Sequence, residues 1–172
     1  MDWVDSFIYL VLISIIAFPI GRSIPKKWLR FDRYPFKDFR WENGGKVYHR
    51  FAIREWQDKV PDMSKIMKKH MKRKSLPPGS TAEDVKYLLD ETCVAEVVHA
   101  LLCVAALYCI KLWRAKGGII FYFLYVVVFN LPYILLQRYN RPRLARLYKR
   151  MTSGLEEQYN CSEEKIKCGE RS

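Results

Sequence analysis

The sequence predicts an all-α integral membrane protein, with about three transmembrane helices and a basic, amphipathic cytosolic interfacial layer. Three apolar runs approach the roughly 20 residues that a helix needs to cross a bilayer. Half of the 172 residues are hydrophobic, yet 28% are charged and the net charge is +12. A chain of this length is expected to form a single membrane domain. Its Lys and Arg residues flank the apolar runs, so the expected partner is an anionic membrane surface rather than nucleic acid.

The three predicted spans cover about residues 3–20, 94–113 and 118–136. The first run begins with Asp2 and Asp5, where a secretory signal peptide would begin with basic residues. It also ends without a small-residue cleavage site. We therefore expect this run to be a retained helix.

The distribution of Lys and Arg predicts the orientation of these spans. Residues 1–21 have none of the 30, residues 22–93 hold 18, the 111–117 turn holds 3, and residues 138–172 hold 9. The positive-inside rule then places the N-terminus outside and the C-terminus in the cytosol. Residues 22–93 form the interfacial segment of this topology, and residues 138–172 form a basic cytosolic tail. Three spans agree with that alternation.

Elements outside the membrane are expected to be short or amphipathic. Residues 31–61 are rich in aromatic side chains, with a turn at Gly44-Gly45. Residues 63–74 have the spacing of a basic amphipathic helix, either on an anionic membrane or packed on its own domain. Ser80-Thr81-Ala82-Glu83 reads as a capping box that starts a helix running uninterrupted through Trp113. Residues 143–151 are expected to continue as a basic amphipathic helix, and the last twenty to be loose.

The second span carries a polar stripe. Its members are spaced 4, 3 and 4 residues apart, so they share one helical face: Thr92, Glu96, His99 and Cys103. Ionisable residues inside a span are costly and therefore candidate functional groups. His99 can take a proton from a hydroxyl while Glu96 orients the imidazole. The alternative is a buried pair that ties helices together.

The third span ends in a motif with an unusual density of donors. Asn130 and Gln137, seven residues apart, share a face, and Pro132 between them is expected to kink the helix. The eight residues that follow the span are Gln137-Arg138-Tyr139-Asn140-Arg141-Pro142-Arg143-Leu144. Arginine forks match phosphate or carboxylate oxygens. The alternative is a basic anchor that only stops the span.

The composition of the segment Trp56 to Asp62 predicts a loop of defined conformation rather than a linker. Asp58 and Asp62 can bind a cation or a sugar hydroxyl, although an ordinary Asp-rich turn has the same composition. We expect no metal centre, because the five cysteines form no CxxC pair and no Cys/His cluster exists. By topology this loop, the Glu96–His99 pair and the arginine motif all map to the cytosolic face, which predicts a site for a lipid headgroup there.

These residues resemble the glycosyl-4,4'-diaponeurosporenoate acyltransferases, a family of small bacterial membrane enzymes. Residues 54–62 resemble the family's Arg-Lys-Trp-Lys-Asp-Lys-Leu-Pro-Asp pattern, from which Glu55, Gln57 and Val60 depart. Residues 91–99 match its Glu-Thr-x-x-Ala-Glu-x-x-His pattern, and residues 130–144 match its last-span motif. The family's named reaction esterifies a fatty acyl group to a sugar hydroxyl of a glycosylated carotenoid acid.

The resemblance implies a multi-pass acyltransferase of a bacterial cell membrane. It would bind no cofactor and would use acyl-CoA or an equivalent donor as co-substrate, with a lipid-linked glycoside as acceptor and membrane lipids around it. His99 and Glu96 are then the expected catalytic pair. The expected substrate- and donor-binding residues are Trp56, Asp58, Asp62, Glu91, Thr92, Asn130, Gln137, Arg138, Asn140, Arg141 and Arg143. Two other classes fit the residues: a small lipid methyltransferase, and a non-catalytic lipid-binding or partner subunit.

Overall fold

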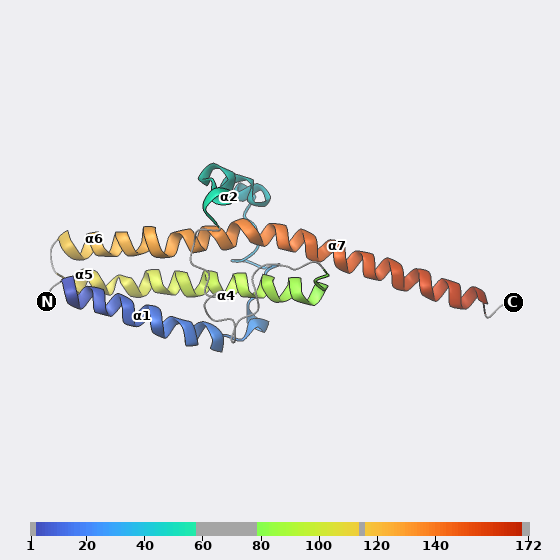
Figure 1. Cartoon of the computed structure of the whole chain (residues 1–172), viewed down its shortest axis with the longest axis horizontal. Helices are drawn as coiled ribbons and strands as arrows, with labels where there is room; N and C mark the ends of the chain where they lie inside the picture. Colours follow the sequence, from blue (N-terminus) through green and yellow to red (C-terminus); the bar gives the residue numbers. More distant parts are fainter. Residues whose placement is uncertain (1–2, 58–78, 114–115, 170–172) are drawn as a thin grey trace.

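A computed structural model describes residues 3–57, 79–113 and 116–169, and their side chains as far as residue 154. Helices and connecting turns make up these ranges, which contain no strand. The elements are α1 (Trp3–Ser23), η1 (Lys26–Trp28), η2 (Arg40–Phe51), α2 (Ile53–Trp56), α4 (Ala82–Ala106), α5 (Tyr108–Leu112), α6 (Lys116–Leu124), η4 (Tyr125–Asn130) and α7 (Leu131–Gly169). Figure 1 shows α1, the α4–α5 helix and the long α6–η4–α7 rod running side by side, and α1 contacts α4, α5 and α6.

Three helical stretches are long and apolar enough to cross a membrane, as the sequence predicted. They are Trp3–Ser23, Ala82–Leu112 and Lys116–Gly154. Many large apolar side chains on these stretches point outward, among them Phe7 and Ile15 on α1 and Phe123 and Phe129 on the third stretch. Such a surface suits lipid rather than water. The chain is therefore an all-α membrane protein.

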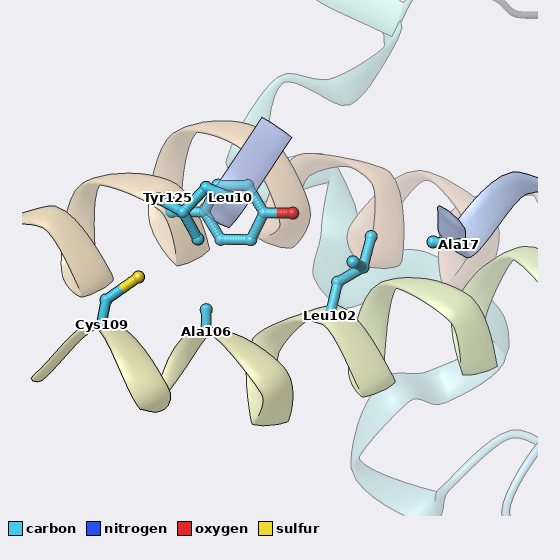
Figure 2. Close-up of a cluster of buried hydrophobic side chains, with 6 residues drawn as sticks. All are labelled: Leu10, Ala17, Leu102, Ala106, Cys109 and Tyr125. Carbon is cyan, nitrogen blue, oxygen red and sulfur yellow. The ribbon is translucent and has the colours of Figure 1, made fainter. Parts of the chain in front are cut away.

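The membrane part of the bundle packs on a small core where α1, α4, α5 and η4 meet. Its buried members are Leu10, Ala17, Leu102, Ala106, Cys109 and Tyr125. Figure 2 shows Leu102, Ala106 and Cys109 projecting from one side of α4 and α5. The small side chains let the helix backbones approach closely. Two hydrogen bonds add to this packing, from Tyr9 to the Ala105 carbonyl at 3.0 Å and between Ser14 and Tyr125 at 2.8 Å.

The helix that contains the second span starts one residue later than the predicted cap, and the prediction that it runs uninterrupted through Trp113 was wrong. Thr81, not Ser80, is the N-cap of α4, and Asp84 replaces Glu83 as its partner. The Thr81 amide donates to Asp84 Oδ2 at 3.1 Å, and the Asp84 amide donates to Thr81 Oγ1 at 3.3 Å. This Thr-x-x-Asp pair completes the same reciprocal cap. The α-helix is then interrupted at Leu107, whose amide turns back to the Val104 carbonyl at 3.1 Å.

The third span changes its helical form where the sequence predicted a kink. Residues Tyr125–Asn130 form a π-helix, and α7 follows with Pro132 in its first turn. Helix α7 then passes through Pro142 and continues to Gly169, so the prediction of a loose last segment was wrong. Residues 143–151 are part of this helix, as expected. The tail carries several Glu and Lys residues, which have high helix propensity.

The interfacial segment folds back against the end of the bundle that carries the arginine motif. Asn43, Gly44 and Gly45 have positive φ angles of 47°, 63° and 87°, which confirms the predicted turn between what are short helical pieces. Four aromatic side chains of this segment are exposed, as expected at headgroup level: Trp28, Tyr34, Trp41 and Phe51. The predicted amphipathic helix over residues 63–74 lies outside the described residues.

Candidate active site

Two acidic and two basic side chains meet where the interfacial segment crosses the bundle. Glu96 comes from α4, Arg138 and Arg141 come from successive turns of α7, and Glu42 comes from η2. Glu42, Glu96 and Arg141 are 2%, 9% and 2% exposed. We call these four residues the buried charge network. Its two carboxylates and two guanidinium groups balance, which offsets the cost of removing each charge from water.

Arg141 binds both the second span and the interfacial segment. Its terminal nitrogen Nη2 lies 2.5 Å from Glu96 Oε2 and donates to the Thr92 carbonyl at 3.1 Å. Its Nε donates to Thr92 Oγ1 at 3.0 Å, and Nη1 donates to the Phe36 carbonyl at 3.0 Å. These contacts occupy most of the donors of one guanidinium group.

Arg138 bridges the two acids. Its Nε donates to Glu96 Oε1 at 2.8 Å, and Nη2 lies 2.7 Å from the same oxygen. Its Nη1 donates to Glu42 Oε1 at 3.0 Å, and Nη2 donates to the Pro35 carbonyl at 2.8 Å. The Phe39 ring lies 4.8 Å from the guanidinium carbon. Arg138 therefore joins α4, α7 and the interfacial segment at one point.

Glu42 is the functional candidate that reasoning from the sequence missed. Its Oε2 accepts a hydrogen bond from the Phe39 amide at 2.7 Å, and Oε1 accepts from the Tyr48 hydroxyl as well as from Arg138. Burial and the hydrogen bond to Glu42 raise the pKa of Tyr48, so its hydroxyl stays protonated and donates. The available signal was that Glu42 is the one acid among the basic and aromatic residues 39–54.

His99 lies one turn after Glu96 on α4 and contacts the third span. Its Nδ1 lies 3.0 Å from Asn130 Oδ1, and its ring stacks on Tyr133 with a centroid distance of 4.6 Å and an angle of 6°. The sequence predicted that Glu96 orients this ring. In the structure both Glu96 oxygens accept from arginine, because Arg138 and Arg141 approach from α7, and the partner of Nδ1 is Asn130.

The other predicted site residues differ in burial and in their contacts. Thr92 and Gln137 are buried at the same end of the bundle, and Glu91 pairs with Lys26 at 2.5 Å, which ties the start of the interfacial segment to α4. Asn140 is half-buried, and the exposed Arg143 lies 4.2 Å over the Tyr139 ring.

Trp56 belongs to a second cluster around Tyr48, Ile53 and Tyr139, and its indole donates to the Phe51 carbonyl at 2.9 Å. Asp58 and Asp62 lie outside the described residues. Among the side chains that the structure does describe, no group of three or more His, Cys, Asp and Glu residues is placed to hold a metal ion.

Known proteins match most of the chain. Residues 25–150 match the family model of the glycosyl-4,4'-diaponeurosporenoate acyltransferases. Curated proteins of that name from Staphylococcus aureus strains MRSA252 and N315 are each 28% identical over 142 residues, which is 82% of this chain and 84% of theirs. No solved structure matches the chain. The family model covers the interfacial segment, the second span and the arginine motif, so the chain belongs to the glycosyl-4,4'-diaponeurosporenoate acyltransferase family.

Proposed function

We propose that this protein moves a fatty acyl group onto a sugar hydroxyl of a glycosylated lipid at the cytosolic face of a bacterial cell membrane. The acceptor is a glycosyl carotenoid acid, as the name of the S. aureus relatives states for those proteins, or a related glycolipid. The proposal rests on the position of His99, which lies one helical turn from the buried charge network. Its ring is hydrogen-bonded to Asn130 and stacked on Tyr133. Membership of an acyltransferase family favours acyl transfer over methyl transfer and over a non-catalytic role.

His99 is the proposed general base. It accepts the proton of the acceptor hydroxyl as that oxygen attacks the acyl carbonyl carbon of acyl-CoA or an equivalent thioester. The bond between the acyl carbon and sulfur then breaks. The leaving thiolate takes the proton from the imidazolium, which returns His99 to its neutral form.

The buried charge network is proposed to set the shape of the site rather than to bind the donor. Most N–H groups of Arg138 and Arg141 already donate hydrogen bonds to Glu96, Glu42 and backbone carbonyls. Arg143 is exposed and is the better candidate for the donor phosphates. Asn140 and Gln137 support it in this proposal, and Asp58 and Asp62 position the sugar or a cation.

The experiment that tests the proposal is an assay of purified protein with isotope-labelled acyl-CoA and a lipid glycoside. We expect His99→Ala to lower turnover by about 10²- to 10⁴-fold, the range for loss of a general base. His49→Ala is the matched control, since His49 is exposed on η2, and should keep its activity. Turnover of His99→Ala close to that of the unmodified protein would exclude His99 as the base.

A parallel assay with labelled S-adenosylmethionine separates the two enzyme classes. Acyl transfer predicts that label reaches the lipid from acyl-CoA and not from S-adenosylmethionine. The reverse result would assign the protein to lipid methylation.

A further inference from the structure

The π-helix η4 brings a backbone carbonyl to the side chain of Asn130. In an α-helix, residues five apart point about 140° away from each other. In a π-helix they are about one turn apart, because the hydrogen bonds run from i to i+5. Tyr125 and Asn130 are accordingly both buried, at 8% and 1% exposure, and Asn130 Nδ2 donates to the Tyr125 carbonyl at 3.1 Å.

This hydrogen bond fixes which end of the amide faces His99. A carbonyl oxygen can only accept, so the amide nitrogen of Asn130 must face Tyr125. The amide oxygen then faces His99 Nδ1 at 3.0 Å. The reversed amide would bring two oxygens together at the 3.1 Å separation of Asn130 Nδ2 and the Tyr125 carbonyl, which electrostatic repulsion opposes.

The orientation of the amide in turn fixes the proton on the imidazole. Because Asn130 Oδ1 can only accept, Nδ1 of His99 must carry the hydrogen. In a neutral ring the lone pair is then on Nε2. Tyr133 stacks flat on the ring at 4.6 Å, so the plane of the ring is held as well as its proton.

We propose that Asn130 is a positioning residue for acyl transfer, which acts with the Tyr125 carbonyl to hold His99 as the Nδ1–H tautomer. Nε2 then receives the proton of the acceptor hydroxyl. This inference rests on the proposed role of His99 as base. It gives the π-helix a function, because an α-helical register would turn Asn130 away from the Tyr125 carbonyl.

The direct test is nitrogen NMR of the full-length protein in detergent, with ¹⁵N in the histidine rings. The spectrum is recorded at alkaline pH, where the rings are neutral, and His99→Gln assigns the signal of His99. We expect Nδ1 of His99 to carry the proton in the unmodified protein, and Asn130→Ala to populate the Nε2–H form. An Nε2–H tautomer in the unmodified protein would overturn the inference, even if Asn130→Ala fails to fold. An unchanged tautomer in a folded Asn130→Ala would do the same.

Kinetics give the second readout. We expect Asn130→Ala to lower kcat by about 10- to 100-fold with little change in KM, because the base is misplaced while substrate contacts remain. Ser14→Ala is the matched control: it removes an interhelical hydrogen bond to Tyr125 of the same π-helix and should leave kcat unchanged. An equal loss of kcat in both variants would mean that Asn130 acts only through packing.

The two readouts separate this inference from the proposed function. If His99→Ala keeps its turnover but the tautomer responds to Asn130 as expected, the role of His99 as base fails. The hydrogen-bond chain from Tyr125 through Asn130 to His99 then stands alone. If His99→Ala loses turnover but the tautomer is not set by Asn130, only the positioning role fails.

Discussion

At the level of single residues, the three arginines of the motif have different environments in the structure, which the sequence did not predict. Three arginines after a span suggest a phosphate site, but their environments in the structure differ. Arg138 and Arg141 are enclosed by Glu42, Glu96 and backbone carbonyls, whereas Arg143 is exposed over Tyr139. Spacing alone cannot separate these cases, because the carboxylate of Glu42 comes from a segment almost a hundred residues away.

Glu42 should be essential for stability. Replacing Glu42 with Gln leaves Glu96 as the only acid of the buried charge network against two arginines, and breaking a buried ion pair in this way costs about 3–5 kcal/mol. We expect the Glu42→Gln protein to unfold at a clearly lower temperature in detergent, measured by circular dichroism. Glu55→Gln, which removes an exposed carboxylate from α2, is the matched control and should unfold like the unmodified protein. Equal unfolding temperatures for the two variants would contradict the assigned role of Glu42.

The sequence predicts which polar residues lie at this end of the bundle better than it predicts the contacts they make. Helical spacing predicted that Glu96 and His99 share one face of the second span, and that Asn130 and Gln137 share one face of the third. In the structure Glu96, Asn130 and Gln137 are buried and His99 is half-buried. The pairing of Asn130 with His99 depends on the π-helix, which adds a residue to one turn and has no sequence signature beyond Pro132. Glu42 was missed because a single acid in a non-periodic segment gives no spacing from which a contact can be inferred.

At the scale of elements, the turn at residues 43–45 decides how the interfacial segment lies on α7. Gly45 is buried with φ of 87°, and a Cβ placed there would lie 3.5 Å from the Pro142 side chain and from the Tyr139 carbonyl. The Gly44 carbonyl accepts from Arg146 at 3.4 Å. The turn therefore sits directly on the helix that carries Arg138 and Arg141, and it positions Glu42 above them.

Gly45→Ala tests the importance of this turn. An alanine at this positive φ costs about 1–2 kcal/mol in backbone strain. We therefore expect the Gly45→Ala protein to be less stable and to transfer acyl groups more slowly. Gly154→Ala is the matched control, because Gly154 is helical, exposed and has nothing within 4 Å of an added Cβ. That change should raise stability by about 0.5–1 kcal/mol through helix propensity. Thermal unfolding and the acyl-transfer assay measure both; a Gly45→Ala protein as stable as Gly154→Ala would contradict the argument.

At the scale of the whole molecule, the three spans place the described residues of the buried charge network and His99 toward one end of the bundle. The sequence predicted this placement from the length of the apolar runs and the distribution of charge. Such a prediction is possible because few backbone structures can cross a bilayer. The break at Leu107 was not predictable in the same way, since no proline marks it. The continuation of α7 to Gly169 was missed although the Glu and Lys residues of the tail favour a helix.

The same charge pattern predicts the orientation of this bundle in the membrane. The end that carries the buried charge network also carries most of the Lys and Arg residues, and moving each charge against a membrane potential costs about 2.3 kcal/mol per 100 mV. We therefore expect this end to face the cytosol. Cysteines introduced at Lys116 and Ser153, both exposed, report on opposite ends once the five native cysteines are replaced. A membrane-impermeant maleimide should label Lys116→Cys in intact cells and Ser153→Cys only in opened membranes. Labelling of Ser153→Cys in intact cells would reverse the topology and would move the proposed site to the outer face.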